Sequence, residues 1–222
     1  MPESALLQPR RTRAVTPLLG AIAFLVLYLA VDVAVGAVST GTMPLPGAPA
    51  GEVYDYLRAN TTGSILTGVL QGLSVLGLAV VVAGPAAKVG GADGRRRAAV
   101  AAGALAVVAM LVSAGLSIAM GLVAESSSVD TVTALRNAGF YTGGVTHVVA
   151  LGVFVWLATR GAAWTRPVRV MGWVAAVPAV LSVLSLLWFY ASPFLPVGRL
   201  LCMVCLVVVG ISLARGASPR AR

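Results

Sequence analysis

Apolar residues fall into six long runs along the chain, and short polar breaks separate one run from the next. A helix needs about 20 mostly apolar residues to cross the hydrocarbon core of a membrane, and each run is close to that length. The pattern therefore predicts an all-α, polytopic membrane bundle of six transmembrane helices. The predicted spans cover approximately residues 16–38, 64–83, 98–124, 138–159, 168–190 and 197–214.

The segments between these runs are too short to hold a separate catalytic domain, so residues 1–222 are expected to form a single integral membrane domain. Residues 1–14 and 215–222 are predicted to be short tails. Residues 39–63 form the longest loop, in which the stretch Glu52–Arg58 is expected to add one or two helical turns at the membrane interface. The six spanning helices are expected to be continuous.

Composition supports a membrane protein, since 59% of the residues are hydrophobic and only 10% are charged. Soluble domains are about 25% charged. The net charge of +9 comes from short clusters at the ends of the runs, so we expect no nucleic-acid partner. Fifteen of the sixteen basic residues are Arg, which is typical of a GC-rich bacterial genome.

The basic residues also predict the orientation, because Lys and Arg gather on the cytoplasmic side of a membrane. With the N-terminus inside, thirteen of the sixteen basic residues fall on the cytoplasmic side. Only Arg58, Arg136 and Arg199 fall outside, and loop 39–63 becomes the longest extracytoplasmic loop. We therefore predict a multi-pass protein of the bacterial inner (plasma) membrane with both termini in the cytoplasm.

Among the polar residues within the predicted spans, five are the candidate ligand-binding residues: Asp32, Gln71, Ser117, His147 and Arg199. A charge at the centre of a spanning helix costs about 2.5–3.5 kcal/mol on insertion scales, so such groups usually face the protein interior. At a rise of about 1.5 Å per residue, all five lie in the outer half of the membrane. If they face inward, they line a shallow polar pocket that is open to the outside and binds a ligand.

Each of these residues also has a purely structural interpretation. Asp32 can reach water near the headgroups, and Arg199 can anchor its helix at the interface. His147 can donate one hydrogen bond to a neighbouring carbonyl group and do no more. The functional alternative pairs Asp32 with His147 or with Arg199.

Asp32 and His147 are the candidate catalytic residues, as an acid/base pair. We expect no metal, because a zinc site needs three or four suitably spaced ligands, and we expect no cofactor. Cys202 and Cys205 lie inside an apolar run, where they are expected to be small packing residues, with a redox-active thiol pair as the alternative.

Small residues repeat at four-residue spacing on three of the predicted helices, which places them on one helix face. Helices in lipid associate through close contact of such residues. The expected packing positions are Gly68 and Gly72, then Ser113, Ser117 and Gly121, then Gly139 and Gly143.

Three short motifs resemble a family of uncharacterised six-helix membrane proteins of high-GC Gram-positive bacteria, known as a domain of unknown function. They are Thr61-Thr62-Gly63-Ser64 after the long loop, Gly143-Gly144-Val145-Thr146-His147, and Pro196-Val197-Gly198-Arg199. The resemblance implies the same six-helix topology and carries no activity.

The leading functional prediction is an accessory or regulatory membrane protein that binds a lipid or small apolar ligand from the outer side. The alternatives are a small membrane-embedded enzyme using Asp32 and His147, and a transporter component. Continuous helices and an off-centre polar layer argue against the transporter, because transporters use broken helices at the midplane. Expected partners are membrane lipid and a second membrane protein or another copy of the chain.

Overall fold

A computed structural model describes residues 8–44, 47–84, 93–161, 164–188 and 191–215. These residues form helices and no strand, and six of the helices are long and apolar enough to cross a membrane. The predicted all-α bundle of six spanning helices is therefore confirmed, and the protein is a multi-pass membrane protein. The spans are Val15–Val38, Thr61–Ala83, Asp93–Val123, Val129–Thr159, Arg166–Leu186 and Phe194–Ala214.

Two of the spans are composite helices, in which regular α-helix changes to another helix type along the way. In chain order the elements are α1 (Gln8–Val38), α2 (Ala50–Ala59), α3 (Thr61–Ala83), α4 (Asp93–Val123), α5 (Val129–Gly139), the π-helix η3 (Phe140–Thr146), α6 (His147–Thr159), α7 (Arg166–Leu181), the 3-10 helix η4 (Ser182–Leu186) and α8 (Phe194–Ala214). The expectation of continuous α-helices was therefore wrong for the fourth and fifth spans.

Several helices begin earlier than predicted, and the largest error lies in the segment expected to be a polar loop before residue 138. Helix α5 starts at Val129, because the Ser128 hydroxyl caps it by accepting the backbone N–H of Thr131 at 3.3 Å. Asp130 adds a negative charge in the first turn, where the helix dipole favours it. Residues 8–14 of the predicted N-terminal tail are helical, while residues 1–7 and 216–222 lie outside the described residues.

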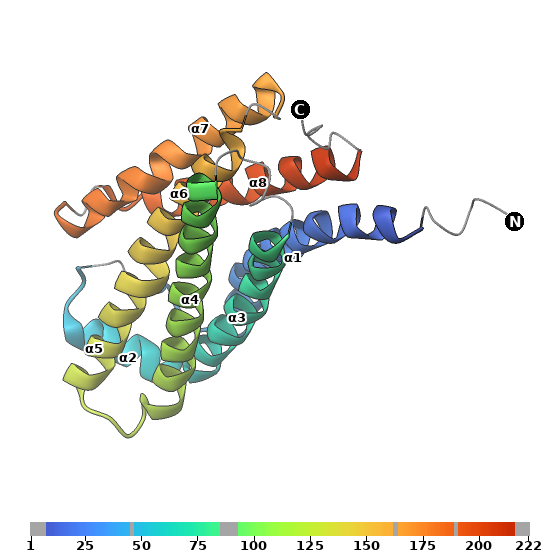
Figure 1. The fold of residues 1–222 in the computed structure, drawn as a ribbon. Helices are drawn as coiled ribbons and strands as arrows, with labels where there is room; N and C mark the ends of the chain where they lie inside the picture. The colour runs from blue at the N-terminus through green and yellow to red at the C-terminus, as the bar shows by residue number, and fades with distance from the viewer. Residues whose placement is uncertain (1–7, 45–46, 85–92, 162–163, 189–190, 216–222) are drawn as a thin grey trace, which may run out of the picture.

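The six spans form a closed ring in which each helix packs against its neighbours in sequence. Helix α8 closes the ring by packing against α1, and α6 also contacts α8. Figure 1 shows α3, α4 and α6 running side by side, with α7 and α8 crossing this group obliquely. The six spans share a hydrophobic core, whose largest fully buried side chains include Phe24, Leu78, Met110 and Phe154.

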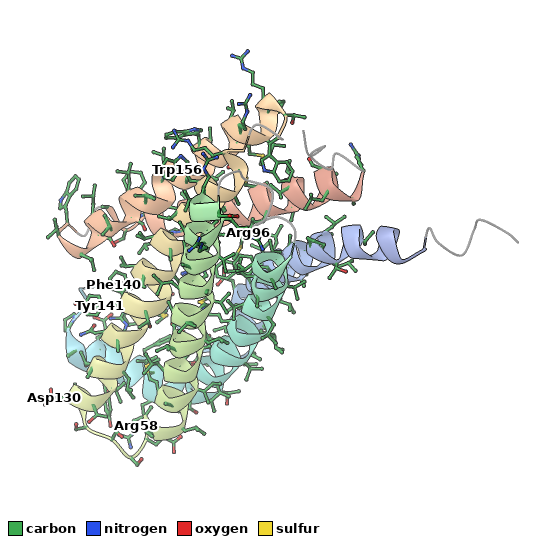
Figure 2. The ribbon with its side chains drawn as sticks, in the orientation of Figure 1. Arg58, Arg96, Asp130, Phe140, Tyr141 and Trp156 are labelled. Atoms are coloured by element: carbon green, nitrogen blue, oxygen red, sulfur yellow. The ribbon has the colours of Figure 1, made fainter. Side chains whose placement is uncertain are left out.

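The two ends of the bundle differ in what they carry. The end called here the α2 end holds α2, the turn after α4 and the start of α5, and the terminal end holds the start of α1 and the end of α8. Figure 2 shows Arg58 and Asp130 at the α2 end, and Arg96 and Trp156 toward the terminal end. Arg160 at the terminal end stacks on Trp156, with its guanidinium carbon 4.6 Å from the ring centroid.

Glycines allow close contact between helices at three of the predicted packing positions. A methyl group on Gly68 would come within 2.5 Å of the Ala114 carbonyl oxygen, and one on Gly121 within 2.7 Å of the Thr61 carbonyl oxygen. A methyl group on Gly143 would collide with the Ser113 side chain. Gly72 and Gly139 have looser surroundings, since the nearest atom to an added methyl group lies at 3.8 Å in both cases.

The predicted interfacial turns in the long loop form helix α2, which is longer than expected. Its apolar side chains Val53 and Leu57 are buried against Met120, Ala124 and Val132, which belong to α4, the following turn and α5. The same stretch is fixed by Asn60, whose side chain accepts the backbone N–H of Thr40 at 2.7 Å and donates to the Thr40 carbonyl at 3.1 Å. Helix α2 thus covers the ends of α4 and α5.

Candidate functional site

A partly open cavity of about 550 Å³ lies at the α2 end of the bundle. Its walls come from α3, α4, α5, η3, η4, the start of α8 and the loop after α1. The volume is within the range of about 300–1,000 Å³ that is usual for small-molecule sites. The polar side chains in its walls include Gln71, Ser117, Arg136, Asn137, Ser185 and Arg199.

Three of the five predicted ligand-binding residues, Gln71, Ser117 and Arg199, line this cavity. Ser117 also lines a second, smaller cavity of about 100 Å³ under α2. Asp32 and His147 are not among the lining residues of either cavity. The structure thus brings part of the predicted polar layer together and separates the two candidate catalytic residues from it.

Arg199 is the most deeply buried charge at the cavity, and only 8% of its surface is exposed. Its Nη1 donates to the Tyr28 hydroxyl at 3.0 Å, and its Nη2 donates to the Gly143 carbonyl oxygen. The guanidinium also lies over the Tyr28 ring, 5.1 Å from the centroid. Its Nε is buried without a hydrogen-bond partner among the described residues. The side chain therefore points into the protein and is not an interfacial anchor.

The π-helix η3 supplies the carbonyl that Arg199 binds. The backbone N–H of His147 donates to the carbonyl oxygens of Gly144 and of Thr142, the latter five residues back, whereas α6 that follows is an α-helix. When the spacing returns from five to four, one carbonyl loses its partner within the helix. The Gly143 carbonyl lies at this change of spacing, and Arg199 donates to its oxygen.

The fifth span changes geometry at the same cavity. Helix α7 gives way to the 3-10 helix η4 at Ser182, whose hydroxyl donates to the Ala179 carbonyl at 2.6 Å. Pro178 lies just before this point and cannot donate a backbone hydrogen bond. Ser185 and the exposed residues Leu187 and Trp188 then line the cavity mouth.

His147 follows η3 and is fully buried, with 0% of its surface exposed. Its Nδ1 lies 2.8 Å from the Ala106 carbonyl oxygen. A carbonyl only accepts, so Nδ1 carries the proton and Nε2 is left as an acceptor. Nε2 has no partner among the described residues, and the ring packs edge-on against Phe24 with centroids 6.2 Å apart. This geometry matches the structural interpretation, in which His147 donates one hydrogen bond to a neighbouring carbonyl.

Asp32 lies on the surface of α1, where its side chain is exposed. Within the described residues it lies farther than 4.0 Å from the basic groups of His147 and Arg199, so neither proposed pairing is present. The buried residues Ala21, Phe24 and Val31 define the inward face of α1. Asp32 directly follows Val31, but its own side chain is exposed.

Arg136 is the main cavity residue that the sequence did not reveal. The apolar pattern leaves Arg136 in the polar break between residues 124 and 138, but it lies on α5 and its Nη2 donates to the Pro44 carbonyl at 3.0 Å. The available signal was the capping residue Ser128 with Asp130 in the first turn, which indicates that the helix begins before Arg136.

No cluster of three or more His, Cys, Asp or Glu that could hold a metal occurs within the described ranges. Cys202 and Cys205 are both free thiols buried in α8, and the Cys202 thiol lies 3.5 Å from the Ala175 carbonyl oxygen. Their position is that of packing residues between α7 and α8.

Comparison with protein families, curated proteins and solved structures finds no match to this chain.

Proposed function

We propose that this membrane protein is of accessory or regulatory type and binds a lipid or small amphiphilic ligand in the cavity at the α2 end. The observation that carries the proposal is the cavity of about 550 Å³ with polar and apolar walls from several helices. Ligand sites typically combine apolar walls with a few polar groups that fix orientation. Ser117 and Gln71 supply polar groups, and Phe140, Leu186 and Trp188 supply apolar ones.

Exposure of the cavity mouth supports a ligand that arrives from the membrane. Leu187 and Trp188 follow η4 and are 88% and 63% exposed, so the rim is apolar where the helix ends. Trp is common at the membrane interface because its ring is apolar and its N–H is polar.

We further propose that the α2 end faces the extracytoplasmic side of a bacterial plasma membrane and that both termini are cytoplasmic. The support is the distribution of basic residues along the sequence, which assigns thirteen of the sixteen to the side of the two termini. Reporter fusions after Arg222 and single-cysteine labelling at Glu52 test this arrangement. Labelling of Glu52→Cys from the cytoplasmic side only would reverse it.

A photo-crosslinking experiment tests ligand binding. The protein is placed in lipid nanodiscs with a phospholipid that carries a diazirine on its acyl chain, and the crosslinked residues are mapped by mass spectrometry. We expect crosslinks at the cavity residues Phe140, Leu187 and Trp188 that excess unlabelled lipid suppresses. Crosslinks spread evenly over outward-facing residues such as Leu73, without competition, would argue against a site.

A cavity-filling variant provides the matched comparison. Ser117→Phe places a large side chain in the cavity wall, whereas Val112→Phe places the same side chain on the outward face of the same helix. Ser117→Phe is expected to abolish the competed crosslinks, and Val112→Phe is expected to leave them unchanged.

A transporter component is the second candidate, and the two changes of helix type favour it. Transporters build their sites where helices are interrupted, and both η3 and η4 line this cavity. Transport requires access from both ends, so a cysteine at Ser117 in a background with Cys202 and Cys205 changed to Ala would be labelled from either side. Labelling from one side alone favours the binding protein.

The enzyme alternative has less support, because general acid/base groups need to reach the same substrate. Asp32 is exposed on α1, and His147 is buried behind Ala106 and Phe24. The resemblance to the six-helix bacterial family adds no activity and stays a prediction.

A further inference from the structure

The cavity walls carry positive charge without any acidic residue among them. Arg136 and Arg199 both line the cavity, and none of its lining residues is Asp or Glu. Neither arginine has a carboxylate within 4.0 Å in the described parts of the chain. Arg is protonated at any physiological pH, so the two guanidinium groups give the walls a fixed positive charge.

Arg199 is held by neutral groups that do not balance its charge. A guanidinium has five N–H donors, and two hydrogen bonds are made, to the Tyr28 hydroxyl and the Gly143 carbonyl. Less than a tenth of the residue's surface is exposed, and its Nε is buried without a hydrogen-bond partner among the described residues. Removing a charge from water is costly unless a counter-charge or a full set of hydrogen bonds replaces the water.

Arg136 is positioned at the cavity in a different way. Its Nη2 donates to the Pro44 carbonyl, which ties the side chain to the loop after α1 and leaves its other donors for a ligand. The side chains of Gln71 and Ser117 make no hydrogen bonds within the described ranges and face the same space. Arginines together with neutral donors of this kind suit phosphate or carboxylate oxygens.

The remaining walls suit a hydrocarbon chain. Met110, Met120, Leu135, Phe140 and Leu186 contribute apolar surface, and exposed Leu187 extends it to the mouth. A small hydrophilic anion would use only the polar part of this space. An amphiphile uses both parts.

We propose that the ligand of this cavity is an anionic amphiphile whose phosphate or carboxylate headgroup binds Arg199 and Arg136 while its hydrocarbon chain lies along the apolar walls. This inference rests on the proposed ligand-binding function and adds the charge class of the ligand. The competing interpretation is that Arg199 only braces Tyr28 and η3 and that the cavity has no preference for anions.

The experiment compares three probes on the full chain in phosphatidylcholine nanodiscs or neutral detergent. Phosphatidylglycerol supplies an anionic head with two chains, diacylglycerol supplies the same chains without the charge, and inorganic phosphate supplies the charge without the chains. Binding is measured by native mass spectrometry and by the shift in thermal unfolding temperature. We expect phosphatidylglycerol to bind at least about tenfold more tightly than either of the other two probes.

The variants are Arg199→Gln, Arg136→Gln and Arg160→Gln. Both cavity variants are expected to weaken phosphatidylglycerol binding by about tenfold or more, with diacylglycerol binding unchanged. Arg160→Gln is the matched control, because Arg160 stacks on Trp156 and Trp173 at the terminal end and does not line the cavity. If Arg199→Gln fails to fold, Arg136→Gln carries the test, since within the described residues the Arg136 side chain is tied by its hydrogen bond to the Pro44 carbonyl alone.

The possible outcomes separate this inference from the proposed function. Equal binding of phosphatidylglycerol and diacylglycerol, unaffected by either cavity variant, would overturn the anion preference and leave a ligand-binding protein. Phosphate binding as tightly as phosphatidylglycerol would overturn the amphiphile. Failure of all three probes to bind the wild-type chain would overturn the proposed function together with the inference.

Discussion

The side of the bundle formed by α1, α3 and α4 contrasts with the side formed by η3, η4 and α8. On the first side, a methyl group on Gly20 would come within 2.8 Å of the Gly77 carbonyl oxygen, and Ser74 donates to the Phe24 carbonyl at 2.7 Å. On the second side, the helical hydrogen bonding changes twice and the cavity opens. Regular helices with small contact residues pack closely, whereas the cavity lies where the π-helix η3 and the 3-10 helix η4 meet α3, α4 and α8.

Disrupting the close contact between α3 and α4 is expected to have the largest effect on stability. Gly121→Val is expected to lower the free energy of unfolding by about 3 kcal/mol, because the added carbons collide with Ile65 and the Thr61 backbone. Thermal unfolding in detergent measures the change. Gly115→Val on the same helix is the control, since nothing lies within 4 Å of the added carbon there. Equal destabilisation by both variants would contradict the close packing of Gly121 against α3.

Tyr28→Phe tests the side of the bundle that holds the cavity. It is expected to lower the free energy of unfolding by about 1.5 kcal/mol, because it leaves a donor of the buried Arg199 unpaired. The aromatic ring under the guanidinium is kept, so only the hydroxyl group is removed. Chemical denaturation of the purified protein measures the loss. An unchanged stability would mean that water replaces the hydroxyl group.

His147→Leu is expected to lower stability by about 1 kcal/mol through loss of the hydrogen bond to Ala106. Ligand binding in the cavity should not change, because His147 does not line it. Loss of binding in a protein that remains folded would show that the buried ring acts in the site after all.

Asp32→Asn gives the smallest expected effect, within about 0.5 kcal/mol, because the side chain is exposed and removed from the cavity. Unfolding temperature and crosslinking efficiency are the two measurements. A marked drop in either one would restore Asp32 as a functional residue.

The six spans were predictable because lipid requires long apolar runs, and the chain has six of them. Helix starts were less predictable where polar residues continue a helix beyond the apolar run, as with Val129 and Asp93. The apolar pattern marks the part of a helix that crosses the hydrocarbon, whereas capping residues such as Ser128 mark where the helix begins.

The candidate site was only partly predictable, because depth along a helix follows from the sequence while rotation around it depends on the neighbours. Gln71, Ser117 and Arg199 were predicted to share one polar layer, and all three line the cavity. Asp32 was assigned to the same layer, but its side chain is exposed and does not line the cavity. The π-helix was not predictable from local sequence, since its Gly143 contacts both Ser113 and Arg199 from other helices.

Methionines contribute three of the apolar side chains around the cavity: Met43 from the loop, and Met110 and Met120 from α4. Their thioethers are unbranched and polarisable, so they adapt to surfaces of different shape more easily than Leu or Ile. For the amphiphile proposed above, such walls would suit chains of different length and saturation around one fixed pair of arginines. Met43 is 51% exposed and thus open to oxidation, and its sulfoxide would place a polar group among these apolar walls.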